Sequence, residues 1–242
     1  MINIKDKKIA VIGEGFEGQS SAKYLKEHGA EVTVLDKKQG EGYLEDLGQY
    51  DLVIRSPGVK LSTLIQYVPQ EKISSQTKLF FDLCPCPIIG VTGTKGKGTT
   101  ASLIYGMLKK QGIDAYLGGN IGRPPFGFLD KLSPQSVAVL ELSSFQLLDL
   151  DKSPHTAVML MTTSEHLDYH KDIEEYINAK RNILRFQSAN DVAILNRDYP
   201  ATNESDIYTD GRIFFVSTER GINGEGCFIK DKAVWLSLNG EE

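Results

Sequence analysis

A glycine-rich turn with two lysines carries the most specific chemical signal in this sequence. The turn, Thr92-Gly-Thr-Lys-Gly-Lys-Gly-Thr-Thr100, follows an apolar run typical of a buried strand and precedes a helical pattern. Backbone amides of such a turn and the positive end of a helix dipole bind phosphate, while a lysine ammonium reaches the β and γ oxygens of a nucleotide. The sequence therefore predicts a triphosphate site. It consists of Gly93, Thr94, Lys95, Gly96, Lys97, Gly98, Thr99 and Thr100.

The residue after the second lysine departs from the usual pattern of these turns. A hydroxyl residue normally follows that lysine and binds Mg²⁺. Gly98 stands there instead, so Thr99 or Thr100 has to supply the hydroxyl. A flexible glycine loop that binds no ligand is the alternative interpretation.

Acidic and histidine side chains follow two further predicted strands. Glu141 comes directly after the strand at residues 137–140, so its carboxylate should emerge near the phosphate turn as a second Mg²⁺ ligand. A solvated charge at the rim of the sheet is the alternative. His166 and His170 lie four residues apart, a spacing that zinc sites on helices use. Solvated loop histidines are the alternative there.

A second glycine turn lies near the N-terminus. Gly13-Glu-Gly-Phe-Glu-Gly18 has GxGxxG spacing between a predicted strand and a predicted helix, and Asp36 ends the next strand. Glycines let backbone N–H groups approach a phosphate, and the carboxylate can accept hydrogen bonds from a ribose or a base. The pattern indicates a nucleotide site. NAD is one candidate, although Glu17 would repel its pyrophosphate, and a packing turn without a ligand is another.

Short apolar runs alternate with helical patterns, which predicts an α/β fold with parallel sheets. The segment Cys84-Pro-Cys-Pro87 forbids a continuous helix, so we place a domain boundary there. Beyond residue 210, alternating segments predict antiparallel ribbons. The predicted strands are residues 9–12, 32–35, 52–54, 88–91, 137–140, 157–161, 192–195, 213–216, 227–229 and 233–238, and the main predicted helices are residues 99–111 and 173–186.

Composition and charge exclude several classes of protein. The 242 residues include 27 Lys and Arg against 32 Asp and Glu, so the net charge of −5 provides no basic field for nucleic acid or an anionic membrane. With 40% apolar and 24% charged residues, the chain should fold rather than stay disordered. Three cysteines without a metal-ligand pattern predict a reducing, cytoplasmic location, and we expect neither a signal peptide nor a membrane span.

Taken in chain order, these motifs resemble those of the Mur ligase family, in particular its D-glutamate-adding branch. The resemblance spans nearly all of the chain and rests on several motifs rather than one. They are the GxGxxG turn with Asp36, the turn at residues 56–59, the phosphate turn, Gly119-Asn-Ile-Gly122, Glu141-Leu-Ser-Ser-Phe-Gln146, Ser164-Glu-His-Leu-Asp168, Tyr176-Ile-Asn-Ala-Lys180 and Asn196-Arg-Asp198.

The resemblance implies a domain organisation and a substrate site. A Rossmann-like domain at residues 1–83 would bind a UDP-sugar. A P-loop-type central ATPase domain at residues 84–242 would be incomplete, and the family's C-terminal domain would be absent. The uridine end of the UDP-sugar would lie at Phe16, Glu17, Asp36, Lys37, Ser56, Pro57, Gly58 and Val59, and its muramoyl and phosphate portions at Asn120, Ser143 and Gln146.

The resemblance also implies a catalytic set, which consists of Lys97, Glu141, His166 and Lys180. Lys97 would bind the ATP phosphates. Thr99 and Glu141 would lie near one Mg²⁺ and His166 near a second. Lys180 matches the lysine that family members carbamylate with CO₂, which turns a cation into a carboxylate-like metal ligand.

The implied reaction belongs to peptidoglycan synthesis. ATP would convert the alanyl carboxylate of UDP-N-acetylmuramoyl-L-alanine to an acyl phosphate, and the amine of D-glutamate would then displace phosphate. We expect a monomer with no nucleic acid or membrane partner and no turnover by this chain alone. Two alternatives remain. One is a folylpolyglutamate synthase-like ligase, a group that lacks the N-terminal Rossmann-like domain, and the other is a non-catalytic nucleotide- or UDP-sugar-binding module.

Overall fold

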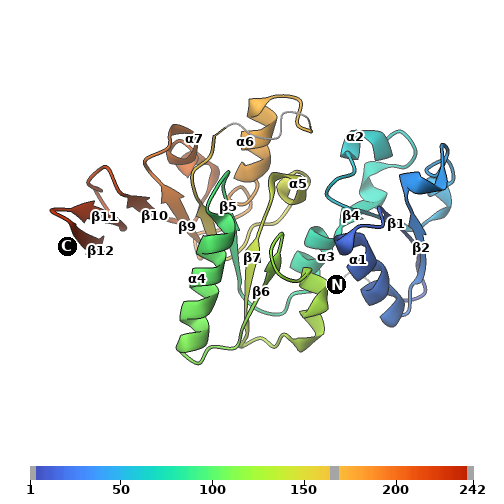
Figure 1. Cartoon of the computed structure of the whole chain (residues 1–242), viewed down its shortest axis with the longest axis horizontal. Helices are drawn as coiled ribbons and strands as arrows, with labels where there is room; N and C mark the ends of the chain where they lie inside the picture. Colours follow the sequence, from blue (N-terminus) through green and yellow to red (C-terminus); the bar gives the residue numbers. More distant parts are fainter. Residues whose placement is uncertain (1–3, 164–168, 239–242) are drawn as a thin grey trace. The chain divides into compact units, whose positions relative to one another are not determined.

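The computed structural model describes residues 4–163 and 169–238 of the chain, which divides into two compact units (Figure 1). Unit 1 comprises Met1–Pro85 and Gly122–Leu132, and unit 2 comprises Cys86–Ile121 and Ser133–Glu242. The first division lies just past the predicted boundary. The sequence pattern gave no indication that residues 122–132 return to the first unit.

Unit 1 is built on a parallel sheet with the strand order β2-β1-β3-β4. The chain runs from β1 to β2 on one side of β1 and then to β3 on the other, so the loops after β1 and β3 diverge at a topological switch point, where open α/β sheets bind ligands. The strands are β1 (Lys8–Ile12), β2 (Glu31–Leu35), β3 (Leu52–Arg55) and β4 (Ile73–Ser75). The helices are α1 (Phe16–Glu27), α2 (Leu61–Leu64) and α3 (Gln76–Leu83), with 3-10 helices η1 (Lys37–Gln39), η2 (Leu47–Gln49), η3 (Gln70–Lys72), η4 (Pro125–Gly127) and η5 (Leu129–Lys131).

Apolar side chains of the two central strands form a core in unit 1. Ala10, Ile12 and Val53 are fully buried and pack with Leu47 and Leu64 from the segments that follow the strands. Burying a side chain of the size of Leu or Ile contributes about 1.5–3 kcal/mol. All four residues of β1 from Ile9 to Ile12 are apolar and buried, as expected of a parallel strand that is covered on both faces.

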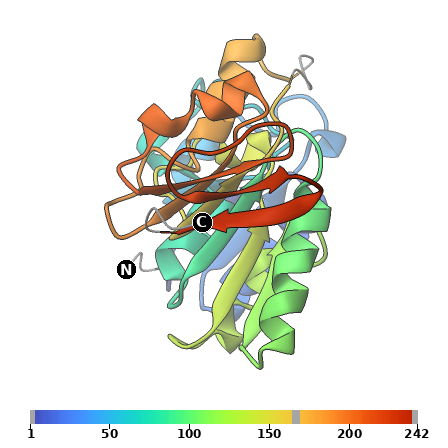
Figure 2. The same cartoon turned by 90° about the vertical axis from the view of Figure 1, so that its left-hand side faces the viewer.

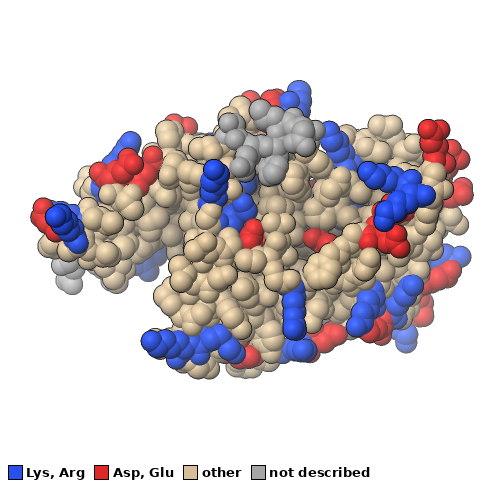
Figure 3. Space-filling view, viewed as in Figure 1, with Lys and Arg blue, Asp and Glu red and all other residues tan. Residues whose placement is uncertain are grey.

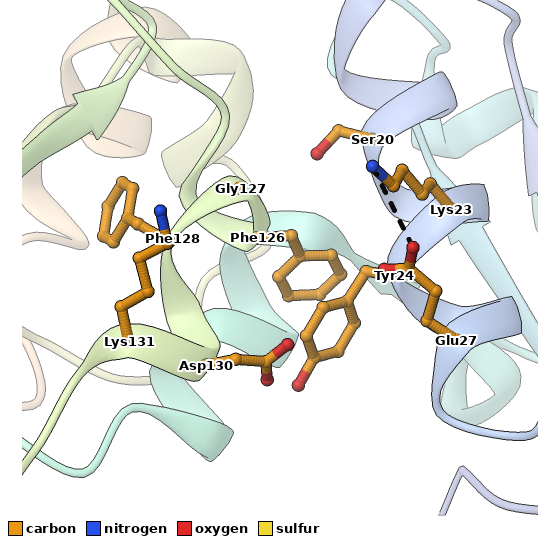
Figure 4. A pocket seen from close by; sticks show the side chains of 9 residues that line it. All are labelled: Ser20, Lys23, Tyr24, Glu27, Phe126, Gly127, Phe128, Asp130 and Lys131. Atoms are coloured by element: carbon orange, nitrogen blue, oxygen red, sulfur yellow. Dashed lines mark ion pairs between the residues drawn. The ribbon is translucent and has the colours of Figure 1, made fainter.

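Aromatic contacts explain why residues 122–132 belong to unit 1. The ring of Phe126 stacks on Tyr24 of α1 with 4.3 Å between centroids, and Phe128 meets Phe80 of α3 edge to face at 5.7 Å. His28 Nε2 lies 3.2 Å from Asp130 Oδ1. Figure 4 shows the stacked rings beside a pocket of about 160 Å³ between α1 and this segment.

Unit 2 contains, within the described residues, an eight-stranded sheet with the order β12-β11-β10-β9-β8-β5-β7-β6. Its neighbouring strands are parallel except β11 and β12 (Figure 2). The loops after β5, β7 and β8 meet at one edge because β5 lies between β7 and β8. The strands are β5 (Ile88–Thr92), β6 (Ala115–Gly119), β7 (Val137–Glu141), β8 (Thr156–Met159), β9 (Val192–Asn196), β10 (Arg212–Ser217), β11 (Gly226–Lys230) and β12 (Ala233–Ser237). The helices are α4 (Lys97–Lys110), α5 (Ser144–Leu147), α6 (Ile173–Arg181) and α7 (Pro200–Asn203), with the 3-10 helix η6 (Asp206–Tyr208).

Helix α4 follows β5 and packs on the centre of this sheet. Its buried residue Ala101 contacts a core formed by Val91, Val139 and Val158 from three adjacent strands. The small side chain of Ala101 allows close approach of helix and sheet, which holds the N-terminal end of α4 at the edge where the three loops meet.

Two predictions of local structure need correction. Helix α6 ends at Arg181 rather than at residue 186, and the strand pair β10–β11 is parallel, with Phe215 opposite Gly226. Only β11 and β12 form the predicted antiparallel ribbon. Alternating burial reveals that one face is covered but carries no information on strand direction. At about 3.3 Å per residue, residues 218–225 suffice to carry the chain back along a short strand.

The surface carries both signs of charge. Over the face that Figure 3 shows, Lys and Arg side chains are interspersed with Asp and Glu side chains. Among the described residues, no helix is both long and apolar enough to cross a membrane.

Candidate functional site

The phosphate turn, residues 92–100, connects β5 to α4 in unit 2 and includes the first residues of that helix. Gly96 precedes the helix with φ +86°, and Gly93 adopts φ +147° where a Cβ would lie 2.8 Å from Cβ of Leu160. Both positions therefore require glycine. No side chain caps the N-terminus of α4. The first N–H groups of this helix therefore lack a side-chain cap, and the binding of a phosphate there stays a prediction.

Thr94 fixes the turn to the residues that follow β8. Its N–H donates to Met161 O at 2.6 Å, its hydroxyl donates to Thr163 O at 3.0 Å, and Thr163 N–H donates back to that hydroxyl at 2.9 Å. Lys97 is half-buried and donates from Nζ to Thr94 O at 2.9 Å. Its ammonium therefore lies over the turn, whereas the side chain of Lys95 is exposed.

The carboxylate of Glu141 lies close to the residue that follows Lys97. A Cβ on Gly98 would lie 3.0 Å from Glu141 Oε2 and 2.9 Å from Ile121 Cδ1, so a Ser or Thr side chain at this position requires the ends of both side chains to shift. Glu141 is buried, and its Oε1 accepts a hydrogen bond from Asn120 Nδ2 at 3.0 Å. The acidic group thus borders the first turn of α4.

That first turn carries the two candidate hydroxyl residues. The side chain of Thr99 is exposed and that of Thr100 is half-buried. The choice between Thr99 and Thr100 as a Mg²⁺ ligand stays open.

Two residues of α6 hold the phosphate turn from the opposite side. Lys180 is 1% exposed, and its Nζ donates to Gly93 O at 2.8 Å and lies 4.7 Å from the centre of the Tyr176 ring. The hydroxyls of Tyr176 and Thr94 are 3.0 Å apart and share a hydrogen bond. Tyr176 and Lys180 are four residues apart on one helix, so they lie on the same face.

A cavity of about 240 Å³ brings together four of the predicted site residues. Lys97, Asn120, Ser143 and Lys180 line it, together with Ser144, Phe145 and Tyr176. Its lining combines two ammonium groups with hydroxyl and amide groups, which suits a ligand that carries anionic and hydrogen-bonding groups.

Gln146 is not among the residues that line this cavity and instead stabilises the start of α5. Its Oε1 accepts from Ser143 N–H at 3.0 Å, and its own N–H donates to Ser143 Oγ at 3.3 Å, which is a capping box at the start of α5. Both side chains are buried. The cap fixes Ser143 at the cavity wall, so Gln146 positions its neighbour.

The prediction of histidine metal ligands stays open, because His166 lies outside the described residues. Within residues 4–163 and 169–238, no three His, Cys, Asp or Glu side chains converge in a metal-binding arrangement. The prediction of a metal at Glu141 therefore rests on this carboxylate with hydroxyl or phosphate oxygens.

In unit 1, Asp36 joins the loops after β1 and β2. Its Oδ2 accepts from Glu14 N–H at 2.8 Å and its Oδ1 from Lys38 N–H at 3.0 Å. These two backbone hydrogen bonds, that from Glu14 first, hold the pKa of the Asp36 carboxyl below its usual value. Asp36 thus stays ionised and fixes the glycine turn.

The three glycines of the first turn have different tasks. Gly13 has φ +98°, and a Cβ there would lie 2.9 Å from Ser56 Oγ. A Cβ on Gly18 would lie 1.9 Å from Gly13 O. A Cβ on Gly15 meets nothing within 4 Å. Packing therefore explains Gly13 and Gly18 but leaves open space above Gly15, where a ligand can approach the N-terminus of α1.

A buried arginine shapes the turn after β3. Arg55 is 1% exposed, and its Nη1 donates to Val59 O at 3.0 Å and to Pro57 O at 3.3 Å. Ser56 N–H donates to Ile12 O. A Cβ on Gly58 would meet nothing within 4 Å. The turn thus directs two carbonyls inward and leaves open space at Gly58.

The remaining predicted residues of this site differ in exposure. Phe16 is 72% exposed, which is unusual for a phenylalanine and leaves one ring available to stack on a planar group. Lys37 is exposed. Glu17 is half-buried in the first turn of α1, and its carbonyl accepts from Gln76 Nε2 at 3.1 Å.

Sequence reasoning missed several residues at the unit 2 cavity. Ser144, Phe145 and Tyr176 all line it, yet none had an assigned role. The spacing of Tyr176 and Lys180 was the available signal, because residues four apart on a helix share a face.

Comparison with known proteins identifies relatives of both units. Residues 91–222 match the Mur ligase middle domain, and residues 3–50 match the NADPH-binding domain of acetohydroxy acid isomeroreductase. The chain is 37% identical to the UDP-N-acetylmuramoylalanine–D-glutamate ligase of Clostridium kluyveri over 99% of this chain and 57% of that protein. It is 38% identical to the protein of the same name from Acetivibrio thermocellus over 94% of this chain and 54% of that protein. The chain thus spans about half the length of the curated relatives it matches.

Solved structures support the fold class. The UDP-N-acetylmuramate:L-alanyl-gamma-D-glutamyl-meso-diaminopimelate ligase from Neisseria meningitides matches with a TM-score of 0.63 and 19% identity, over 98% of this chain and 85% of that one. The MurF ligase from Thermotoga maritima in complex with ADP matches with a TM-score of 0.52 and 19% identity, over 96% and 55%. The predicted α/β fold class is confirmed.

Proposed function

Because this chain belongs to the Mur ligase family, we propose that it forms part of an ATP-dependent ligase that joins D-glutamate to UDP-N-acetylmuramoyl-L-alanine. The observation that carries the proposal is the convergence of Lys97, Glu141 and Lys180 on the phosphate turn of unit 2. The identity of 37% to a protein named for this reaction supports the choice of substrates.

The residues of the phosphate turn fit the triphosphate of ATP. The uncapped N-terminus of α4 offers N–H groups, and the ammonium of Lys97 lies over the turn. We expect these groups to bind the phosphates and to stabilise negative charge when the alanyl carboxylate approaches the γ-phosphate. No side chain has to act as a nucleophile, because the carboxylate oxygen attacks the phosphorus and ADP leaves. The D-glutamate amine then attacks the carbonyl carbon and phosphate leaves.

Glu141 fits a role at Mg²⁺. It is a buried carboxylate beside the first turn of α4, and hard oxygen ligands are those that Mg²⁺ prefers. Bound Mg²⁺ would neutralise charge between the two anionic reactants. Asn120 holds Glu141 in place through Oε1 and leaves Oε2 directed to α4.

Carbamylation of Lys180 is the finer part of this proposal. The side chain lines the cavity and is otherwise buried, so its ammonium would repel a nearby metal. A carbamate formed with CO₂ would reverse that charge. Incubation of the chain with ¹³C-labelled bicarbonate should give a carbamate signal in ¹³C NMR that is lost in Lys180→Met and kept in Lys110→Met, which changes an exposed lysine at the end of α4.

The site in unit 1 supports a UDP-sugar as the larger substrate. There is open space above Gly15 and above Gly58, and Gly15 directly precedes Phe16, whose ring is exposed. Backbone groups for a diphosphate and a ring for a planar base are therefore present in unit 1. A domain of this kind also favours the proposed ligase over a folylpolyglutamate synthase-like enzyme. Three cysteines without a metal-ligand pattern, Cys84, Cys86 and Cys227, agree with the cytoplasmic location that we propose. The monomeric state stays a prediction.

Calorimetric titration of the chain tests the substrate assignment. UDP-N-acetylmuramoyl-L-alanine should bind at least about tenfold more tightly than UDP-N-acetylglucosamine, because only the former carries the lactoyl-alanyl group with its amide and carboxylate, which the protein can bind in addition to the UDP-sugar. Equal affinity for the two UDP-sugars would contradict the proposed substrate. If the chain binds Mg-ATP but neither of the two UDP-sugars, a nucleotide-binding module would be favoured.

A further inference from the structure

His170 is a buried histidine that the proposed reaction does not use. Its side chain has no solvent exposure, its Nε2 lies 2.9 Å from Ser144 Oγ, and its Nδ1 lies 3.4 Å from Glu175 Oε2. Ser144 belongs to α5 and Glu175 to α6, two helices that pack against each other (Figure 1). His170 therefore connects the two helices that supply Ser144 and Lys180 to the cavity.

Aromatic rings hold the imidazole in one orientation. The ring of Phe145 is parallel to it, with 5.6 Å between centroids and 3° between planes. Tyr169 and Tyr176 meet it edge to face at 5.3 and 5.4 Å. The imidazole cannot rotate without displacing these rings, so Nε2 stays at Ser144 Oγ. Nδ1 makes no hydrogen bond to Glu175 but stays beside its carboxylate, which acts on this nitrogen through its charge.

The fixed position of Glu175 sets the polarity of the hydrogen bond to Ser144. Glu175 Oε2 accepts from Lys171 N–H at 2.8 Å, and Glu175 N–H donates to the helix cap Asp172 at 2.8 Å. A carboxylate beside Nδ1 favours a proton on that nitrogen, which leaves Nε2 of the neutral imidazole as an acceptor. The hydroxyl of Ser144 then donates to Nε2, and its lone pairs remain available.

Those lone pairs belong to a side chain that lines the 240 Å³ cavity. The neighbouring hydroxyl of Ser143 is committed to the capping box with Gln146. Lys97, on the same cavity, supplies a cation. The cavity therefore offers a positive charge together with one hydroxyl that is oriented as an acceptor.

We propose that His170 is a positioning residue that orients the Ser144 hydroxyl as a hydrogen-bond acceptor for an N–H group of the ligand in this cavity. The matching chemical class is an amide whose N–H neighbours a carboxylate, because the carboxylate can face Lys97 while the N–H faces Ser144. The inference rests on the proposed function, since the alanyl residue of UDP-N-acetylmuramoyl-L-alanine has this arrangement.

The test compares UDP-N-acetylmuramoyl-L-alanine with its ester analogue, in which oxygen replaces the alanyl N–H, by calorimetric titration of the chain. The wild-type chain should bind the ester about five- to tenfold more weakly, and Ser144→Ala should bind both ligands equally. Ser136→Ala is a matched control, because it removes another buried serine of unit 2 that donates to Asp114 at 2.6 Å. It should keep the preference for the amide.

Substitutions in the chain of contacts Ser144–His170–Glu175, here called the relay, give a second test. His170→Asn and Glu175→Ala should reduce the amide preference to less than about twofold. Glu174→Ala removes an exposed carboxylate from the same helical turn and should keep it. Thermal unfolding shows which variants are folded. In ¹⁵N NMR of the histidine-labelled wild-type chain, the His170 signals are those that disappear in His170→Asn. They should show that the neutral imidazole carries its proton on Nδ1, a result that does not depend on the binding measurements.

The outcomes separate the two claims. Equal binding of amide and ester by the wild-type chain would overturn the role of Ser144 and leave the proposed ligase intact. A His170 signal with a proton on Nε2 would overturn the orientation of the relay. Failure of both ligands to bind would overturn the proposed substrate, and this inference with it.

Discussion

Lys180 donates a hydrogen bond from Nζ to the carbonyl oxygen of Gly93 at 2.8 Å, across 87 residues of sequence. The donor is a buried side chain of α6, and the acceptor lies in the phosphate turn. A buried carbonyl that loses its donor is destabilised, so this bond stabilises the carbonyl of Gly93 in the turn. The bond makes the position of the turn depend on α6.

Lys180→Met should destabilise unit 2. Methionine keeps most of the side-chain length but leaves the carbonyl of Gly93 without this donor, which costs about 1–3 kcal/mol. Urea unfolding measures the change in the free energy of unfolding. Lys110→Met, an exposed position on α4, should change it by less than about 0.5 kcal/mol. Equal unfolding curves for the two variants would argue against the bond.

Glu141→Gln should remove the benefit of Mg²⁺ for ATP binding. Glutamine has the same shape and can still accept from Asn120, but it lacks the negative charge that a hard cation needs. With Mg²⁺, ATP affinity should fall about tenfold or more, whereas without Mg²⁺ it should stay the same or rise. A calorimetric titration under both conditions provides its own control. Equal losses with and without Mg²⁺ would indicate a purely structural role.

Local sequence signals were sufficient to find both glycine turns and the residues next to them. A strand, a glycine turn and a helix follow one another directly in the chain, so Lys97 and Asp36 could be placed at strand ends without tertiary information. The closeness of Gly98 to the carboxylate of Glu141 was not predictable, because it depends on where Glu141 lies after folding.

Contacts between distant segments account for what the sequence did not reveal. His170 could be noticed as a histidine but not as the partner of Ser144, since that bond depends on the packing of α5 against α6. The return of residues 122–132 to unit 1 depends on ring contacts such as Tyr24 with Phe126. The parallel direction of β10 and β11 likewise could not be predicted from an alternating pattern of apolar residues.

Gly15→Ala and Gly18→Ala should separate ligand binding from folding. A Cβ at position 15 meets nothing within 4 Å, so this variant should fold but bind UDP about tenfold more weakly because the methyl group occupies the ligand's approach. At position 18 the Cβ would lie 1.9 Å from Gly13 O, so Gly18→Ala should lose more than about 2 kcal/mol of stability. Thermal unfolding and UDP titration measure the two effects. If Gly15→Ala binds UDP with normal affinity, the proposal that the diphosphate binds at this turn would be wrong.

Tyr24 combines burial with a nearby carboxylate. The residue is 7% exposed, stacks between Phe126 at 4.3 Å and His28 at 4.0 Å, and its hydroxyl points toward Asp130 in Figure 4. Burial first, and the charge of Asp130 second, raise the pKa of Tyr24 to about 12. The folded chain thus keeps the phenolic proton at a pH where the unfolded chain loses it.

This difference should make stability fall at alkaline pH. A phenol whose pKa is raised on folding contributes its full stability below the unfolded value near 10 and loses it as the pH rises toward 12, a change of about 2–3 kcal/mol. Urea unfolding between about pH 9 and about pH 12 measures the loss. Tyr24→Phe should lack this component, because phenylalanine has no proton to release. Tyr67→Phe, at a tyrosine that is 43% exposed, should retain it. The same alkaline slope in wild type and Tyr24→Phe would show that another group accounts for the loss.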